Sequence, residues 1–441
     1  MVDSDAKVLK EFGGSLGALI LILWSHGLIY YLWICLEFHQ GGLFLPSSLS
    51  EAPSFLSQYI SHITTSACPT LEAFIIFFTF FILQIILAIT LPGPLVKGLP
   101  VPSENNKVYV YKCNAVWCWY FTFILLFALN YFQLFKLSRI QELHGPLMTV
   151  VIITSDLLSF VIYFSGILLK KSTRMSGEFI YDFFMGSWLN PRIGSFDLKM
   201  WAEIRVSWMQ LYILTVAAAL KQYETLGYLT GGMYLILYAQ YLYSNACMKG
   251  EECVPTTWDI FYEKWGWMLI FWNIAGVPYV YSFQAQYILK NPQKWNPLLL
   301  AGLFIILTFA YYIWDTSQSQ KNRFRAGLSG NYVPRKAFPQ LPWGTLTNPK
   351  YLKTECGSLL LIDGWWQYAR KIHYTADIIM ASIWAVSCGF NGVLPYFYPA
   401  FFTGMLTHRN RRDTERCQRK YGKDWIKYTR IVKYAFIPGI I

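Results

Sequence analysis

Polar, basic and aromatic side chains gather in the last quarter of the chain, from Asp363 to Tyr428. This segment begins DGWWQYARKIHYTAD and ends HRNRRDTERCQRKYGKDWIKY, with an apolar stretch between the two parts. The paired tryptophans and Tyr374 offer flat faces for a purine or a nicotinamide ring, and Arg370 and His373 can bind phosphate or ribose. Polar sequence bordering apolar stretches is costly unless it lines a site. The residue types therefore indicate a binding site for an aromatic, phosphate-bearing molecule.

The closing part of this segment has helical spacing. Arg409, Asp413, Cys417 and Lys420 follow one another at intervals of three or four residues, which places them on one side of a helix. A basic amphipathic helix lying on anionic lipid would explain the cations. It would not explain an aspartate in so basic a run, nor the Tyr-Gly-x-x-Trp-x-x-Tyr pattern that follows. We therefore expect these residues to belong to the same site.

Other polar groups stand within or beside apolar stretches. Lys321 and Arg325 are four residues apart and share a helical face, as ordinary interfacial charge or as a phosphate clamp. Tyr241 and Tyr243 end an apolar stretch, and either hydroxyl could donate a proton or orient a ligand. Several polar residues on one apolar segment indicate a polar-tipped cavity. They are Asn273, Tyr279, Tyr281, Gln284 and Gln286.

The elements that must position these groups are membrane helices. Hydrophobic residues make up 55% of the 441 residues and charged residues only 14%, against roughly 25% in soluble proteins. Apolar stretches of about 20 residues, the length that crosses a bilayer, recur throughout. They lie at roughly 15–36, 72–92, 115–133, 147–170, 204–221, 225–246, 265–288 and 297–315, followed by a broken pair over 376–405. We expect an all-α polytopic membrane protein of about ten helices.

We interpret the chain as one integral domain over residues 1–441, with N-terminal helices to about residue 290 and a C-terminal half over about 297–441. The loop 37–70 has no Lys or Arg, whereas loops 93–114 and 171–203 and the tail do. This alternation predicts that both termini are cytosolic. Lys136, Arg139, Lys290 and Lys294 do not fit it, because the scheme places them on the lumenal side. The net charge of +12 is explained by loop cations and anionic lipid, so we expect no nucleic-acid partner.

Several common kinds of chemistry lack their signatures. The nine cysteines are scattered without a CxxC pair, which argues against a disulfide framework or a zinc site. No GxGxxG or Walker sequence is present, and no HExxH or tandem His pattern that would bind metal. We expect no metal. A redox enzyme built on this chain would need an organic cofactor held by membrane helices.

The closing motifs resemble those of the sterol reductase family, which includes the C-14 and C-7 reductases, the membrane domain of the lamin B receptor and the C-24(28) reductases. The shared motifs are LLxDGWWxxARKxHYxxD, within residues 359–377, and RxxxDxxxCxxKYGxxWxxY over 409–428. The stretches YDFFMGSWLNPRIGSFDLKMWAEIR, LYSNACMKGEE and SCGFNGVLPYFYPAFF look like the C-24(28) branch. The resemblance covers nearly the whole chain and implies a multi-pass protein of the endoplasmic reticulum membrane.

The resemblance further implies NADPH in a cytosol-facing pocket of the C-terminal helices and a sterol substrate that enters from the bilayer. The implied cofactor contacts are Lys321, Arg325, Leu361, Trp366, His373, Tyr374, Arg409, Asp413, Cys417, Gln418, Arg419, Lys420, Tyr421 and Tyr428. Some branches have Asn at the position of His373. The implied proton-handling pair is Asp413 with either Tyr241 or Tyr243.

The implied reaction is reduction of the C-24(28) double bond, by protonation and then hydride transfer, at the end of ergosterol synthesis. Because cations surround Asp413, we expect it to orient or relay, and a Tyr hydroxyl or an ordered water to be the immediate donor. Partners would be membrane lipid and other sterol-synthesis enzymes. Alternatives are a sterol reductase of another position (C-14 or C-7), a methyltransferase of the isoprenylcysteine carboxyl type, and a lipid transporter or sterol receptor.

Overall fold

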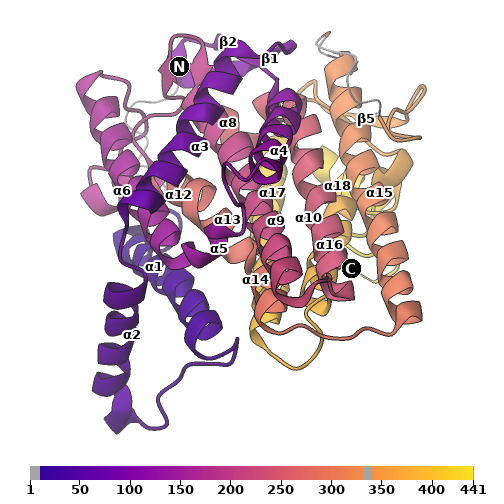
Figure 1. The fold of residues 1–441 in the computed structure, drawn as a ribbon. Coiled ribbons are helices and arrows are strands. Elements are labelled where there is room, and N and C mark those ends of the chain that lie inside the picture. Colours follow the sequence, from indigo (N-terminus) through magenta and orange to yellow (C-terminus); the bar gives the residue numbers. More distant parts are fainter. Residues whose placement is uncertain (1–9, 329, 331–339, 441) are drawn as a thin grey trace. The chain divides into compact units, whose positions relative to one another are not determined.

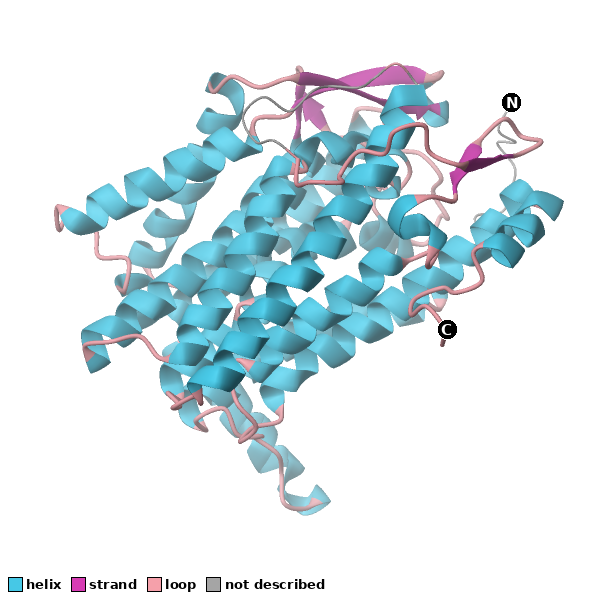
Figure 2. Ribbon diagram, turned by 90° about the vertical axis from the view of Figure 1, so that its right-hand side faces the viewer, coloured by secondary structure: helices cyan, strands magenta, loops and turns pink. Residues whose placement is uncertain are grey.

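The computed structural model describes residues 10–328, 330 and 340–440 (Figure 1). Helices make up most of this part, and the strands pair only as three short two-stranded hairpins (Figure 2). The chain packs into two compact units. Unit 1 comprises Met1–Leu229 and Ser244–Pro292, and unit 2 comprises Thr230–Tyr243 and Gln293–Ile441. The prediction of a single domain remains a prediction.

Unit 1 contains most of the predicted N-terminal helices. The helices of unit 1 are α1 (Gly14–Phe38), α2 (Ala52–Ser66), α3 (Leu71–Thr90), α4 (Ala115–Tyr131), α5 (Arg139–Glu142), α6 (His144–Leu168), α7 (Phe179–Met185), α8 (Leu198–Trp201), α9 (Ser207–Leu226), α11 (Trp258–Phe261), α12 (Trp267–Phe271), α13 (Val277–Tyr281) and α14 (Phe283–Lys290). Two π-helical turns, Ala202–Val206 and Trp272–Gly276, precede α9 and α13 and contact each other. All five polar residues predicted for a cavity on the 265–288 segment are buried.

Four helices in the described residues are long and apolar enough to cross a membrane: α1, α3, α6 and α15 (Pro297–Leu328). Helices α4 and α16 (Ile372–Val386) are apolar but shorter. Large apolar side chains point outward from these helices, such as Leu23, which is 64% exposed, and Ile305, which is 70% exposed. Such faces suit lipid rather than water. Each predicted span coincides with at least one helix, but the number ten is not confirmed.

At one end of unit 1 the segments between helices pack together. The strands β1 (Leu95–Val101) and β2 (Lys107–Lys112) form an antiparallel hairpin, as do β3 (Arg192–Ile193) and β4 (Phe196–Asp197), and β2 contacts β4. Lys199, which is completely buried, donates from Nζ to the carbonyl oxygens of Asp259 (2.7 Å), Ile260 (2.9 Å) and Glu263 (2.8 Å). The segments that precede α4, α9 and α12 therefore meet at this end.

Acidic partners in unit 1 account for two of the four cations that did not fit the predicted orientation. Arg139 pairs with Glu72 at 2.7 Å, and Lys290 pairs with Glu37 at 2.9 Å. A paired cation is a weaker topology signal than a free one, because part of its charge is already compensated. These pairs join the ends of helices that would face the same side in the predicted scheme.

Unit 2 is built on α15 and α16, which pack along each other (Figure 1). The first turns of α10 (Gly231–Lys249) also belong to it. The remaining elements are β5 (Tyr351–Lys353), β6 (Leu359–Leu361), the 3-10 turns Gly364–Gln367 and Leu394–Tyr396, α17 (Phe397–Tyr421) and α18 (Lys423–Ile431). Helices α16 and α17, which cover the predicted broken pair over 376–405, form a hairpin, and Asn391 and Pro395 lie in its connection.

Candidate functional site

The segment DGWW is fixed against α15 by its own turn geometry. The Asp363 carboxylate accepts a hydrogen bond from the backbone N–H of Gly364 at 2.7 Å and starts the 3-10 turn. Gly364 has φ +59°, and a Cβ there would collide with the Gln320 side chain, so this position requires glycine. The Gln320 carbonyl oxygen accepts from the N–H of Trp365 at 2.9 Å. These contacts set the direction in which the tryptophans point.

Trp366 is the centre of the candidate site. It is 3% exposed, and its indole N–H donates to the carbonyl oxygen of Ser317 at 2.8 Å. The Nζ of Lys321, one turn further along α15, lies 4.2 Å from the centre of the indole. His373 lies on the other side of the motif, with its ring 5.2 Å from that of Trp366 and 4.4 Å from that of Tyr374. The structure therefore brings four of the predicted cofactor residues together.

The Nδ1 atom of His373 is placed to bind a ligand. This atom is buried and has no hydrogen-bond partner among the described residues. A buried polar atom without a partner costs about 1–3 kcal/mol, so native structures seldom keep one without a reason. Beside a buried indole and a Lys ammonium, this atom suits a hydroxyl or phosphate of a bound nucleotide. The residues present thus fit a dinucleotide cofactor, with Lys321 for its phosphate and Trp366 for a ring.

Asp413 on α17 joins the site through Lys371. The Lys371 ammonium donates to one carboxylate oxygen of Asp413, and Arg416 donates to the other at 2.6 Å. Burial would raise the pKa of Asp413, but Lys371, Arg416 and Lys321 outweigh it and lower the pKa to about 2. The carboxyl is therefore ionised at neutral pH. Lys371 was not among the predicted site residues, although it stands in the motif beside His373.

Helix α18 closes over the hairpin β5–β6. Trp425, Tyr428 and Val432 form a buried cluster, against which the partly buried Cys417 and Tyr421 pack. The Tyr428 hydroxyl donates to the carbonyl oxygen of Leu361 at 3.5 Å, and burial raises the pKa of Tyr428 to about 12. The cluster thus binds the carbonyl oxygen of one predicted cofactor residue, Leu361, and contains three others: Cys417, Tyr421 and Tyr428. Because their side chains pack on one another, part of their role is to support the site.

The other predicted cofactor residues lie on the exposed side of α15 and α17. Arg325, Arg409, Gln418, Arg419 and Lys420 are all exposed. The charges of Arg325, Lys371 and Asp413 act on Lys321, and those of Arg409 and Lys371 act on His373, so the cations surround the same region. Exposed cations around a buried aromatic ring suit an anionic ligand that reaches the ring from outside.

Arg370 has a different function from the one its type suggested. Its Nη1 donates to the carbonyl oxygens of Val432 and Lys433, both at 2.6 Å. The backbone N–H of Lys371 donates to Ala435 at 2.8 Å in the same segment. These bonds tie the segment after α18 to the start of α16. The Arg370 guanidinium is thus directed at the backbone of the chain end.

Of the two candidate tyrosines, Tyr243 contacts two tryptophans and a buried carboxyl. Two residues apart on a helix, Tyr241 and Tyr243 point to nearly opposite faces of α10. The Tyr243 ring lies 4.9 Å from the ring of Trp314 and 5.7 Å from that of Trp384. The Asp377 carboxyl lies against Tyr243 and Trp314. Sequence reasoning noticed Asp377 only as the end of a motif.

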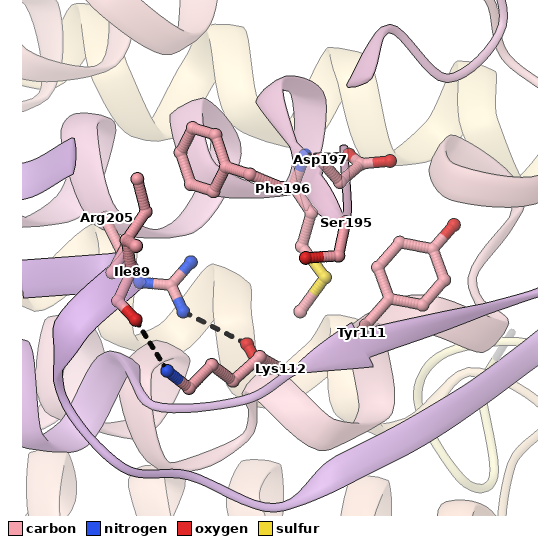
Figure 3. Close-up of a pocket in the computed structure, with 9 residues that line it drawn as sticks. Ile89, Tyr111, Lys112, Ser195, Phe196, Asp197 and Arg205 are labelled. Carbon is pink, nitrogen blue, oxygen red and sulfur yellow. Dashed lines mark hydrogen bonds between the residues drawn. The ribbon is translucent and has the colours of Figure 1, made fainter. Parts of the chain in front are cut away.

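A hollow lies in unit 1, between β2, the β3–β4 hairpin and the end of α3 (Figure 3). Arg205 Nη2 donates to the carbonyl oxygen of Lys112 at 3.3 Å, and Lys112 Nζ donates to that of Ile89 at 2.8 Å. Arg205 also pairs with the buried Glu251 at 2.7 Å. The volume of about 130 Å³ is below the roughly 300–1,000 Å³ of small-molecule pockets. Its polar groups serve the packing of unit 1. No group of three or more metal-ligating side chains occurs in the described chain.

Comparison with known proteins covers almost the entire sequence. A family model described as the ergosterol biosynthesis ERG4/ERG24 family matches residues 6–441. The Delta(24(24(1)))-sterol reductase erg4A of Aspergillus fumigatus is 43% identical over 99% of this chain and 93% of its own length. The Delta(24(24(1)))-sterol reductase of Gibberella zeae is 42% identical over 100% and 74%. A Delta(14)-sterol reductase of Dictyostelium discoideum is 35% identical over 98% and 92%.

Proposed function

The chain belongs to the ERG4/ERG24 ergosterol biosynthesis family, and from this premise we propose that it reduces the C-24(28) double bond of a sterol side chain with NADPH, the last step of ergosterol synthesis. Support for this position of the double bond comes from the 43% and 42% identical relatives, both Delta(24(24(1)))-sterol reductases by name. The Delta(14)-sterol reductase named above is 35% identical. The observation that carries the enzymatic part is the cluster of Trp366, Lys321 and His373, whose Nδ1 has no partner among the residues that the structure describes.

NADPH supplies a hydride when bound. Trp366 and Tyr374 would hold its nicotinamide end, and Lys321 with the exposed cations of α15 and α17 would hold its phosphates. The cations Lys321, Arg325, Arg409, Arg419 and Lys420 are enough for a diphosphate and a 2′-phosphate, which favours NADPH over NADH. Equal activity with the two cofactors would contradict this assignment.

The substrate determines the order of the steps. An isolated alkene has no carbonyl to polarise, so hydride addition alone would give a very basic carbanion. Protonation at C28 instead leaves positive charge at C24, which can then accept the hydride. The protein must hold C24 within about 3–3.5 Å of the hydride donor and exclude water. Tyr243, whose ring contacts Trp314 and Trp384, suits the role of proton donor, because it is half-buried among aromatic side chains.

Asp413 suits a different role. Its carboxylate is ionised and holds Lys371 and Arg416, so it would orient the cationic side of the cofactor site rather than protonate the alkene. The finer features of topology are also part of the proposal: about ten transmembrane helices, both termini in the cytosol and residence in the endoplasmic reticulum membrane. Membrane lipid and other sterol-synthesis enzymes would be its partners there.

One experiment distinguishes the reductases from one another. The full-length chain is expressed in a strain that lacks its own C-24(28) reductase, and the sterols are analysed by mass spectrometry. We expect loss of the 24(28)-methylene sterol and appearance of its reduced product. Continued accumulation would refute the assignment. Rescue of a C-14 or C-7 reductase mutant would instead assign the double bond to that position. A methyltransferase, a transporter or a receptor would not oxidise NADPH when sterol is added.

A further inference from the structure

We propose that Asp377 positions the Tyr243 hydroxyl and passes it the proton that the alkene receives. The inference rests on the proposed function and assigns a residue that the site described above does not use. Asp377 lies on α16 and is 7% exposed. Its Oδ1 has no hydrogen-bond partner among the described residues, and its carboxyl lies against Tyr243 and Trp314. A buried carboxyl with a spare oxygen beside a tyrosine is equipped to exchange a proton with it.

The position of Asp377 connects the two halves of the chemistry. His373 and Asp377 are four residues apart on α16, so they share a face, one turn apart. His373 belongs to the cofactor cluster around Trp366, and Asp377 faces Tyr243 of α10. One helical face thus leads from the candidate cofactor site to the candidate proton donor. Sites for hydride and proton transfer have to be adjacent, because the two atoms are added to neighbouring carbons.

Aromatic side chains lie around this pair, in which Asp377 is buried and Tyr243 is half-buried. The Tyr243 ring contacts the indoles of Trp314 and Trp384, and Trp384 stacks on Tyr398 with 5.3 Å between ring centres. Trp384 is 1% exposed. A dry surrounding protects a carbocation from capture by water. The charged group that acts on Asp377 from the neighbouring helix α17 is Arg409, and Tyr243 and Trp314 are the other groups that face it.

The proton reaches the alkene in two transfers. The Tyr243 O–H bond breaks as the C28–H bond forms, and the Asp377 carboxyl returns a proton to the tyrosine oxygen. Water reprotonates Asp377 after product leaves. With the hydride that NADPH supplies to C24, the sum is alkene, NADPH and one proton giving the saturated side chain and NADP⁺. Asp377 touches neither substrate nor cofactor in this scheme, so it is a positioning residue.

The test uses Asp377→Asn in the full-length protein, because Asn has the size of Asp but cannot pass on a carboxyl proton. We expect turnover at saturating NADPH to fall by about 10²–10⁴, with the KM for NADPH within threefold of the wild type. Tyr243→Phe should show a similar loss, and the double variant should be no worse than Tyr243→Phe. The alkaline limb of the pH–rate profile, where an essential acid loses its proton, and the solvent deuterium isotope effect should both change in Asp377→Asn. A merely structural role would leave these two readouts unmoved.

The controls separate this inference from the proposed function. A wild-type protein that reduces no 24(28)-methylene sterol overturns the proposed function and the inference with it. An active wild type with Asp377→Asn turnover within threefold overturns the inference alone, as do losses that multiply in the double variant. NADPH binding, followed by quenching of tryptophan fluorescence, reports whether Asp377→Asn is folded. If it is not, Tyr243→Phe decides, since turnover within threefold removes the group through which Asp377 would act.

Discussion

Replacing Asp413 by Asn tests whether this carboxyl is a proton donor or an anchor. Asp413 accepts hydrogen bonds from Lys371 and, at 2.6 Å, from Arg416, and these cations with Lys321 lower its pKa to about 2 despite burial. At pH 7 only about one molecule in 10⁵ would carry the proton, since each pKa unit is a factor of ten. Reaction through that minor form would add about 7 kcal/mol to the barrier, at about 1.4 kcal/mol per unit. A direct donor with this handicap would be a poor catalyst.

We therefore expect Asp413→Asn to keep turnover within about tenfold at saturating NADPH and to raise the KM for NADPH. Asn retains one acceptor oxygen but loses the charge that fixes Lys371 and Arg416. A hydrogen bond to a charged group contributes about 1.5–3 kcal/mol, so the KM should rise about 10- to 100-fold. The assay is sterol-dependent NADPH oxidation by the detergent-purified protein, over a range of NADPH concentrations.

The matched control is Asp424→Asn. Asp424 is likewise a hydrogen-bonded carboxylate: it accepts from the backbone N–H of Glu355 at 2.7 Å and pairs with Lys427 at 3.1 Å. It lies at the start of α18, outside the cluster around Trp366, so this variant should leave the KM for NADPH unchanged. A loss of turnover of 10³ or more in Asp413→Asn, at saturating NADPH and with unchanged thermal unfolding, would show that the Asp413 carboxyl itself moves the proton. That result would refute the reasoning from its pKa.

Three further outcomes follow from the same contacts. Lys321→Met should raise the KM for NADPH at least about tenfold, through loss of a charge-assisted bond, and Lys321→Arg should restore most of it; equal KM values would contradict the phosphate role. Because the pKa of Asp413 is lowered from 3.8 to about 2, its stabilisation is present above pH 3.8 and is lost as pH falls to 2. That loss is at most about 2 kcal/mol, so between pH 5 and pH 2 the free energy of unfolding, measured in denaturant by circular dichroism, should fall by about that much more in the wild type than in Asp413→Asn. Lys199→Met should lower the unfolding temperature by several degrees, because three buried carbonyl oxygens lose their donor, without changing the KM for NADPH.

The length of the apolar stretches was sufficient to locate the membrane helices. The elements that lie in the polar segments between them could not be predicted. Apolar stretches of about 20 residues have few alternatives to a helix. Strand β2 of the hairpin β1–β2 has the alternating sequence KVYVYK, but the segment 93–114 was predicted as a loop because it lies between two predicted spans. Helix α2 was not predicted, and none of its residues is buried, so it has no core face to mark it in the sequence.

Site residues whose role follows from their type and position in a motif could be predicted from the sequence. Residues whose role depends on a partner far along the chain could not. Trp366, His373 and Tyr374 stand together in the sequence and in the structure. Arg370 belongs to the same motif, but its partners are carbonyl oxygens more than 60 residues further along the chain. Spacing alone cannot reveal a backbone partner so distant. Asp377 was likewise hidden, because its contact with Tyr243 brings together two helices far apart in sequence.

The geometry of α16 gives a reason for the order of the motif residues. Under the proposed function, a hydride arrives from the side of His373 and a proton from the side of Asp377. Four residues of an α-helix rise by about 6 Å. That spacing leaves room for the two carbons of one double bond between a nicotinamide held near Trp366 and the Tyr243 hydroxyl. The helix would thus set the distance between the two transfers, while Asp413 and Lys371 keep the cofactor end in place.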